Sequence, residues 1–439
     1  MRRALLFAAL SLVLASAGAR AQEPQARLSP GRLTLTDAMR IGRQQAVSAV
    51  LARLNVRLAD ARQGQRRADL LPSVSGSARW YRQTLNFDEF GFPGVSGVGD
   101  PFNVWSFQIK ASQSIYDPSL WARQKAATDS AEASSLDALT AGDLAAATAG
   151  IAYVRVLGSR EEVSARLADS AIAADLLEQS RQLVISGVSP PIDSTRSSVN
   201  FAAVRTDLII ARNQEDRDRL ELARTLDLPP GGALDLADSL AFTTDQIPSD
   251  ADSAVAFALG HRTEVQAESQ RVTVAERNLK AIKYENLPSL GAAGQYTQSG
   301  PSLDGLNGSY QVGLGVSIPI FDGLKRQTRA SEQSARLDEQ KLRLHDTQRQ
   351  VETETRQALL DIDAASQQAG LARDRLRLAV LELDQAGERF KAGIASSIET
   401  TNAQLSVVAA RDVLIQARVA LGVARLSAFR ALGILADLQ

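Results

Sequence analysis

The sequence predicts a mainly helical protein with a membrane β-barrel, built from a duplicated helix-strand-strand-helix-helix unit. The second half of the chain repeats short signatures of the first. Leu71-Pro72-Ser73 returns as Leu287-Pro288-Ser289, and Ile115-Tyr116-Asp117 returns as Ile320-Phe321-Asp322. The offset between the copies is far longer than a solenoid repeat, so each copy is itself a large structural unit. We therefore predict a first repeat at 22–227, a linker at 228–252 and a second repeat at 253–439.

The first 21 residues have the pattern of a secretion signal. Arg2 and Arg3 supply the positive start, an apolar stretch runs over 4–17, and Ala19-Arg20-Ala21 is a small-x-small cleavage site. We predict a signal peptide at 1–21. A transmembrane anchor is the alternative, but the apolar run is well under the roughly 20 residues that a helix needs to span a bilayer. The chain has no cysteine, so it lacks the residue that lipoprotein processing would acylate.

A regular seven-residue apolar period predicts a long helix over about 324–391. Two rows alternate by three and four residues, which is the pattern of a coiled-coil seam. At 1.5 Å per residue this helix would be about 100 Å long. The segment 119–186 is its less regular counterpart, in which Arg166 breaks the pattern. The rows consist of Leu337, Leu344, Val351, Ala358, Ala365, Ala372, Ala379 and Ala386, with Ile362, Ala369, Leu376, Leu383 and Phe390.

Shorter helices are predicted at about 37–70 and 253–286, and each ends at a Leu-Pro dipeptide. Terminal helices are predicted at about 194–227 and 398–435. Proline and glycine are frequent in 228–249, which indicates a linker that lies over the helices.

Two pairs of strands are predicted, at about 74–85 with 104–115 and at 290–298 with 310–320. The segment 310–320 alternates apolar and small or polar residues, as does 104–115. Strands of this length are close to the 9 to 11 residues that a tilted membrane-spanning strand requires. A half-buried sheet in a soluble domain is the alternative. Four strands cannot close a barrel and lipid does not tolerate an open edge, so a membrane role requires several chains, and three would supply twelve strands.

Composition argues against several functional classes. The chain has 49 Lys and Arg against 50 Asp and Glu, whereas nucleic-acid binding favours a clustered basic surface. His261 and His345 are the only histidines and belong to different predicted helices, so a histidine-based metal site or catalytic triad is not expected. We predict no enzymatic activity, no cofactor and no nucleic-acid partner.

The ordered set of these features resembles the TolC family of outer-membrane efflux channels. The Leu-Pro dipeptides before the strands, the Ile-aromatic-Asp exits and above all the run from Arg389 to Glu399 carry the resemblance. It implies a homotrimer with a twelve-stranded barrel in outer-membrane lipid and a helical tunnel in the periplasm. It also implies a passive exit channel of a tripartite efflux or type I secretion system, with a periplasmic adaptor and an inner-membrane pump or ABC transporter as partners.

The resemblance also implies site residues at the closed periplasmic tip. Glu399 and Asn402 fall where a pore constriction is expected, and Asn402 departs from the acid that is common there. Glu399 has a second interpretation, because Ser396-x-x-Glu399 is a capping-box pattern. Asp193 and Arg196 fall at the tip and gate. Asp193 follows Pro190-Pro191 and reads as a helix cap, and Arg196 either pairs with an acid across the tip or is a solvated surface residue.

The turns before the two terminal helices are where the family meets its adaptor, and Gly187 and Gly393 also read as helix C-caps. The expected adaptor contacts are Gly187, Val188, Ser189, Gly393, Ile394 and Ala395. Two other classes stay open from the residues alone. A periplasmic coiled-coil adaptor would explain one helical hairpin, and a structural coiled-coil protein would explain the heptads, but neither explains the strand pairs. The sequence does not indicate the transported substrate.

Overall fold

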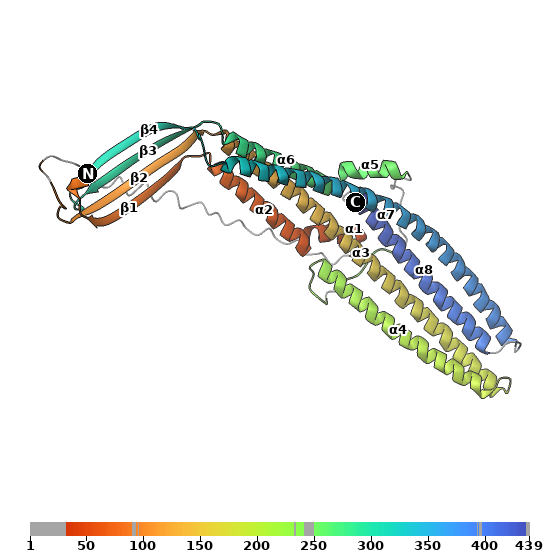
Figure 1. The fold of residues 1–439 in the computed structure, drawn as a ribbon. Helices are drawn as coiled ribbons and strands as arrows, with labels where there is room; N and C mark the ends of the chain where they lie inside the picture. The colour runs from red at the N-terminus through yellow and green to blue at the C-terminus, as the bar shows by residue number, and fades with distance from the viewer. Residues whose placement is uncertain are drawn as a thin grey trace.

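The computed structural model describes residues 32–89, 94, 96–231, 234–240, 250–392, 394 and 397–435. The predicted signal peptide lies outside these residues. The molecule is elongated, with a β-sheet at one end and the turns of two long helical hairpins at the other (Figure 1).

The elements of the second half follow the order of the first. The first half contains α1 (Leu35–Gln45), α2 (Val47–Ala68), β1 (Ser73–Gln83), the short 3-10 helix η1 (Phe87–Glu89), β2 (Phe102–Tyr116), α3 (Pro118–Ile185) and α4 (Pro191–Thr225). The second half contains α5 (Ala251–His261), α6 (Thr263–Tyr284), β3 (Ser289–Gly300), β4 (Asn307–Ser317), α7 (Lys325–Lys391) and α8 (Ser397–Leu432). The boundaries of the two repeats stay a prediction.

Each of the two shorter helices is broken, so the prediction of continuous helices over 37–70 and 253–286 was wrong. The first break is at Ala46, which has φ −54° and ψ 137°, and the second is at Arg262, which has φ −64° and ψ 120°. These ψ values lie outside the helical region. The Arg262 side chain is buried and forms ion pairs with Glu264 at 2.6 Å and Glu354 at 2.9 Å. The ion pair with Glu354 of α7 therefore stabilises the helix break at Arg262.

The four strands form one antiparallel sheet in the order β1-β2-β3-β4. The register places Trp105, Phe107 and Ile109 opposite Trp80, Ala78 and Gly76 on one face, as the alternation predicts. The strand ends differ from prediction by a few residues. In particular β4 spans 307–317 rather than 310–320, and Ile320 is 94% exposed just beyond it.

Long helices continue directly from the sheet. Next to it, α2 packs against α3, α3 against α6 and α6 against α7, which gives a wall one helix thick (Figure 1). Farther away the wall consists of the hairpins α3/α4 and α7/α8, which meet through α3 and α8. Among the described residues, no helix has the length and apolar character needed to cross a membrane.

The predicted heptad seam of α7 is confirmed. Val351, Ala358 and Ala365 are among its buried members, and the alanines pack against α8 in three small clusters. In one of them Ala358 meets Ala428 and Ala431. Small side chains on both helices permit the close approach of two backbones over many turns, which a row of leucines would prevent.

Arg166 breaks the apolar row of α3 because it forms an ion pair with α8. Its guanidinium lies 2.7 Å from Asp412, and Arg411 of α8 in turn binds Asp169 of α3. Burial lowers the pKa of Arg166, but the hydrogen bond and charge of Asp412 outweigh it and raise the pKa above its usual value. Burial raises the pKa of the Asp169 carboxyl, against the opposing charge of Arg411. These two crossed pairs join the two hairpins.

The largest core lies where α1, α3, α4 and α8 meet the linker. Tyr153 of α3 is fully buried there, and its hydroxyl lies 2.8 Å from the Leu33 carbonyl and 2.9 Å from Asp238. Leu236 is buried in the same cluster, and backbone hydrogen bonds join residues 235 and 237 to Leu33. The linker segment 234–240 is therefore packed against the helices.

Candidate functional site

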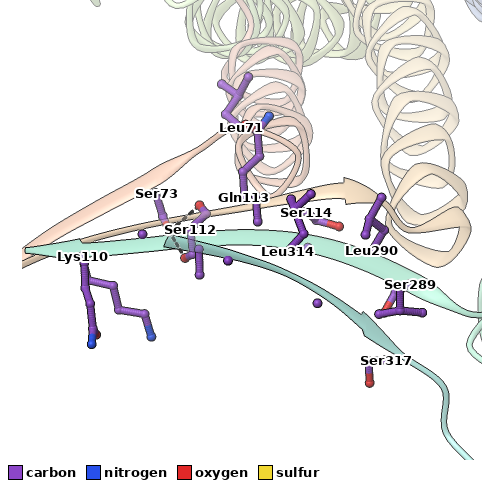
Figure 2. Close-up of a pocket in the computed structure, with 18 of the residues that line it drawn as sticks. Leu71, Ser73, Lys110, Ser112, Gln113, Ser114, Ser289, Leu290, Leu314 and Ser317 are labelled. Atoms are coloured by element: carbon purple, nitrogen blue, oxygen red, sulfur yellow. Dashed lines mark hydrogen bonds between the residues drawn. The ribbon is translucent and has the colours of Figure 1, made fainter. Parts of the chain in front are cut away.

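The sheet has one polar and one apolar face. The polar face lines an open hollow of about 1120 Å³ that reaches the end of α2 and the first turn of α3 (Figure 2). Amide hydrogen bonds of 3.0 Å run across it from Gln108 to Gln295 and from Gln295 to Gln311. Ser73 and Ser112 hydrogen-bond on the same face at 2.9 Å. These bonds join side chains across each of the three strand pairs and satisfy their polar groups. No apolar layer of the described chain covers this face.

The opposite face exposes large apolar side chains. Along β4, Tyr310, Val312 and Leu314 are 82%, 78% and 73% exposed. In a single chain in water this surface would be unfavourable, because each large apolar side chain gains about 1.5–3 kcal/mol when it is removed from water. Alternation of an exposed apolar face with a polar face is the pattern of membrane-spanning strands.

Both edges of the sheet are unpaired in the described chain. β1 pairs only with β2, and β4 pairs only with β3. An edge strand presents a row of backbone donors and acceptors that pair readily with another strand. In lipid those groups require a partner, because no water is present to satisfy them.

The turn between α3 and α4 ends α3 as the sequence predicts. Gly187 has φ +76°, its amide donates to the Val184 carbonyl at 3.1 Å, and the Val188 amide donates to the Leu183 carbonyl at 2.9 Å. This is the Schellman motif, in which a glycine accepts the left-handed conformation. The C-cap prediction for Gly187 is confirmed. Val188 is 62% exposed, and Ser189 follows it in the turn.

The turn between α7 and α8 is described in part. The Ile394 amide donates to the Arg389 carbonyl at 3.0 Å, and the Ile394 side chain is 73% exposed. Gly393 and Ala395, which are expected adaptor contacts, lie outside the described residues. Each turn thus places a large apolar side chain in solvent at the end of the helices that is distant from the sheet (Figure 1).

Asp193 is not a helix cap, so that interpretation was wrong. Pro190 occupies the N-cap of α4 without a side-chain capping bond, and Asp193 lies within the first turn. Its buried carboxylate accepts a 2.6 Å hydrogen bond from the Ser397 hydroxyl at the start of α8. Arg196 lies 3.8 Å from the same carboxylate, on the same helix and half exposed. Among the described residues of one chain, Arg196 therefore pairs with an acid of its own helix.

Glu399 forms an ion pair with Arg389 of α7 at 3.1 Å, and its side chain is 42% exposed. The capping alternative depends on Ser396, which lies outside the described residues. Asn402 is exposed one turn farther along α8. The chain therefore leaves both predicted constriction residues accessible to solvent or to a neighbouring copy.

Three residues that join the hairpins near the tip were not expected from the sequence. Ser397 binds Asp193, and Asn200 of α4 donates to Gln404 of α8 at 2.9 Å. Gln404 is buried and also approaches the Asp169 carbonyl at 3.4 Å. No local pattern marks these side chains, because their partners are about 200 positions away in the sequence.

The sequence model of the outer membrane efflux protein family matches residues 42–227 and 255–433, which together are most of the chain and include both hairpins and all four strands. The chain belongs to the outer membrane efflux protein family. Proteins of this family lie in the outer membrane with a helical tunnel in the periplasm, and this localisation holds for the chain. The family match gives no support to the adaptor or structural coiled-coil alternatives.

Individual family members are distant in sequence. The pyoverdine export outer membrane protein OpmQ of Pseudomonas aeruginosa is 25% identical over 403 residues, with 89% of this chain and 82% of that protein covered. The outer membrane efflux protein BepC of Brucella suis is 26% identical, and the chain spans only half of its length. The crystal structure of the CmeC outer membrane channel of Campylobacter jejuni has 16% identity and a TM-score of 0.79, with 91% of this chain and 85% of that one covered. The chain therefore shares its fold with these proteins although most of its residues differ from theirs.

Proposed function

We propose that the protein is the outer-membrane exit channel of a tripartite efflux or type I secretion system. Three copies close their sheets into one barrel, and their helical walls form one tunnel that leads from the periplasm to the exterior. The observation that carries this proposal is the four-stranded sheet, with its exposed apolar face and its two unpaired edges. A closed barrel satisfies both edges and places the apolar face in lipid.

Trimer formation is supported by the exposed apolar side chains of the outermost helices. α2 and α4 lie at one side of the wall and α7 lies at the other. Each of these three helices exposes several large apolar side chains. Leu51 is 55% exposed, Ile209 is 67% exposed and Leu371 is 72% exposed. Burial of such rows against the opposite side of a neighbouring copy would stabilise a ring of identical subunits.

The hydrogen bonds between α4 and α8 support a gate at the tip. Asp193 with Ser397 and Asn200 with Gln404 hold the two hairpins of one chain together. Separation of the hairpins would break both bonds and widen the opening. In this proposal the Glu399 and Asn402 side chains of three copies surround the constriction, where a ring of carboxylates favours cations.

The partners are a periplasmic adaptor and an inner-membrane pump or ABC transporter that supplies energy. The adaptor contacts are Gly187, Val188, Ser189, Gly393, Ile394 and Ala395, at the two turns. The exposure of Val188 and Ile394 supports this assignment, because solvent-exposed apolar tips indicate a surface that a partner covers.

The substitution Ser397→Ala tests the gate. A hydrogen bond to a charged acceptor contributes about 1.5–3 kcal/mol, so its loss would favour the open tip by a factor of about 10 to 100 per chain. The purified trimer should show larger or longer openings in planar bilayers. Ser198→Ala is the matched control, because among the described residues the Ser198 hydroxyl bonds only the Ser194 carbonyl of its own helix. Equal conductance of both variants and the native protein would show that the hydrogen bond between Asp193 and Ser397 does not hold the tip closed.

A further inference from the structure

The charges on the strands have a single sign. Within β1 to β4 there is no Asp or Glu, and the charged residues are Arg79, Arg82 and Lys110. The register pairs Arg79 with Ser106 and Lys110 with Ser75, which places both cations on the polar face. Lys110 lines the hollow of that face (Figure 2).

A second hollow, of about 610 Å³, lies where α2, α3, α6 and α7 leave the sheet. Among the described residues that line it there are five arginines and no carboxylate. We call these five residues the arginine belt. They are Arg62, Arg66, Arg123, Arg329 and Arg336.

The belt and the polar face of the sheet lie on the same side of the wall. Asp69 lines the hollow of the sheet, whereas Arg62 and Arg66 line the second hollow. Arg62 and Arg66 of α2 and its C-cap Asp69 are spaced by four and three positions, so they share one face of the helix. Because a barrel in lipid turns its polar face inward, the arginine belt faces the interior of the tunnel.

Nearby acids only partly neutralise the belt. Glu285 pairs with both Arg123 and Arg329, Asp69 pairs with Arg66 at 3.4 Å, and Glu332 pairs with Arg336 at 2.6 Å. No ion pair joins Arg62 to another described residue. Five guanidinium groups against three carboxylates leave a surplus of two positive charges per chain, to which Arg79 and Lys110 add two more.

We propose that the outer part of this channel selects small solutes that carry several carboxylate or phosphate groups. The inference depends on the proposed channel function, because only a closed ring of three chains surrounds the solute with the belt. Guanidinium groups bind carboxylate and phosphate oxygens in pairs, and a lining of one sign raises the local concentration of counter-ions. At physiological salt this attraction reaches about 8 Å from the wall and increases with the charge of the solute.

The belt therefore acts differently from the tip. Glu399 would favour cations at the narrow end, whereas the belt holds anions in the wide part once the tip has opened. A multivalent anion delivered by the pump would meet the belt before it leaves through the barrel. This order would reduce its return to the periplasm.

Calorimetric titration of the purified trimer with inorganic tripolyphosphate tests the inference. We expect saturable binding to the native protein that weakens as the salt concentration rises. The double variant Arg62→Gln/Arg336→Gln should bind at least about tenfold more weakly, since each lost contact to a charged group is worth about 1.5–3 kcal/mol. Arg123 and Arg329 are left intact because they hold Glu285 between α3, α6 and α7.

The matched control is Arg57→Gln/Lys341→Gln. It removes the same charge from α2 and α7, five positions from the belt residues, at exposed side chains that do not line either hollow. No binding to the native protein, or equal loss in both double variants, would overturn the inference. Single-channel recording of the same samples separates it from the proposed function. Channels without tripolyphosphate binding refute anion selection alone, whereas a native protein that forms no channels refutes both.

Discussion

Two neighbouring residues of β4 provide a direct test of which face of the sheet meets lipid. Val312 is at the centre of the strand, on the apolar face, and is 78% exposed. Gln311 points to the polar face, where it accepts a hydrogen bond from Gln295. A lysine at a lipid-facing position near the bilayer midplane costs about 2–4 kcal/mol per chain. A lysine at position 311 would lose only the Gln295 hydrogen bond, which is worth about 0.5–1.5 kcal/mol.

Val312→Lys should therefore reduce assembly much more than Gln311→Lys. Three chains each carry the substitution, so the cost to one barrel is about 6–12 kcal/mol. The assay is the amount of protein of full native mass extracted by detergent from outer membranes. We expect at least about a tenfold lower yield for Val312→Lys and a near-native yield for Gln311→Lys. Equal yields, or the reverse order, would refute the assignment of the two faces.

Two further substitutions test how the helices pack. In Gly158→Ala the added methyl group would lie 2.5 Å from the Cγ2 atom of Val419, so the Val419 side chain or the packing of α3 on α8 must shift, at a cost of about 1–3 kcal/mol. Gly370→Ala, in open space on α7, should stabilise the helix by about 0.5–1 kcal/mol. Thermal unfolding followed by circular dichroism compares them, and a Gly158→Ala protein as stable as Gly370→Ala would contradict the close approach. Burial acts to raise the pKa of Glu354, but hydrogen bonds from Gln350 and Arg262 outweigh it and hold the pKa below its ordinary value of 4.5. Because the folded carboxyl binds its proton less readily than the unfolded one, its contribution is present above pH 4.5 and is lost as the pH falls through the folded pKa. Glu354→Gln should thus be less stable than the native protein at neutral pH, with a difference that vanishes in acid, and a difference independent of pH would contradict this pair.

Local periodicity predicted the long helices well. The apolar rows of α7 recur every seven residues without interruption. The predicted end at 391 coincides with the observed end, and the predicted start at 324 is one residue before Lys325. The two faces of the strands were also predictable, because side chains alternate strictly along a strand. The ends of the strands were less predictable. Ile318 and Ile320 continue the alternation beyond β4 although they have no ladder partners among the described strands.

Features that depend on distant partners could not be predicted. Asp193 after two prolines has the local pattern of a helix cap, but its hydrogen bond is to Ser397, 204 positions away. Arg166 interrupts an apolar row of the sequence, and its partner Asp412 lies 246 positions away on α8. The helix break at Arg262 likewise depends on Glu354, which is 92 positions away. In each case a polar contact with a residue far away in the sequence overrides the local pattern.

We propose that the four-stranded sheet of one chain is a third of a membrane barrel. The native mass of the mature protein, extracted in detergent from isolated outer membranes, tests it most directly. We expect a trimer that requires detergent to stay in solution. A monomer or dimer recovered without detergent would contradict it, because the apolar face and both edges of the sheet would then be exposed to water.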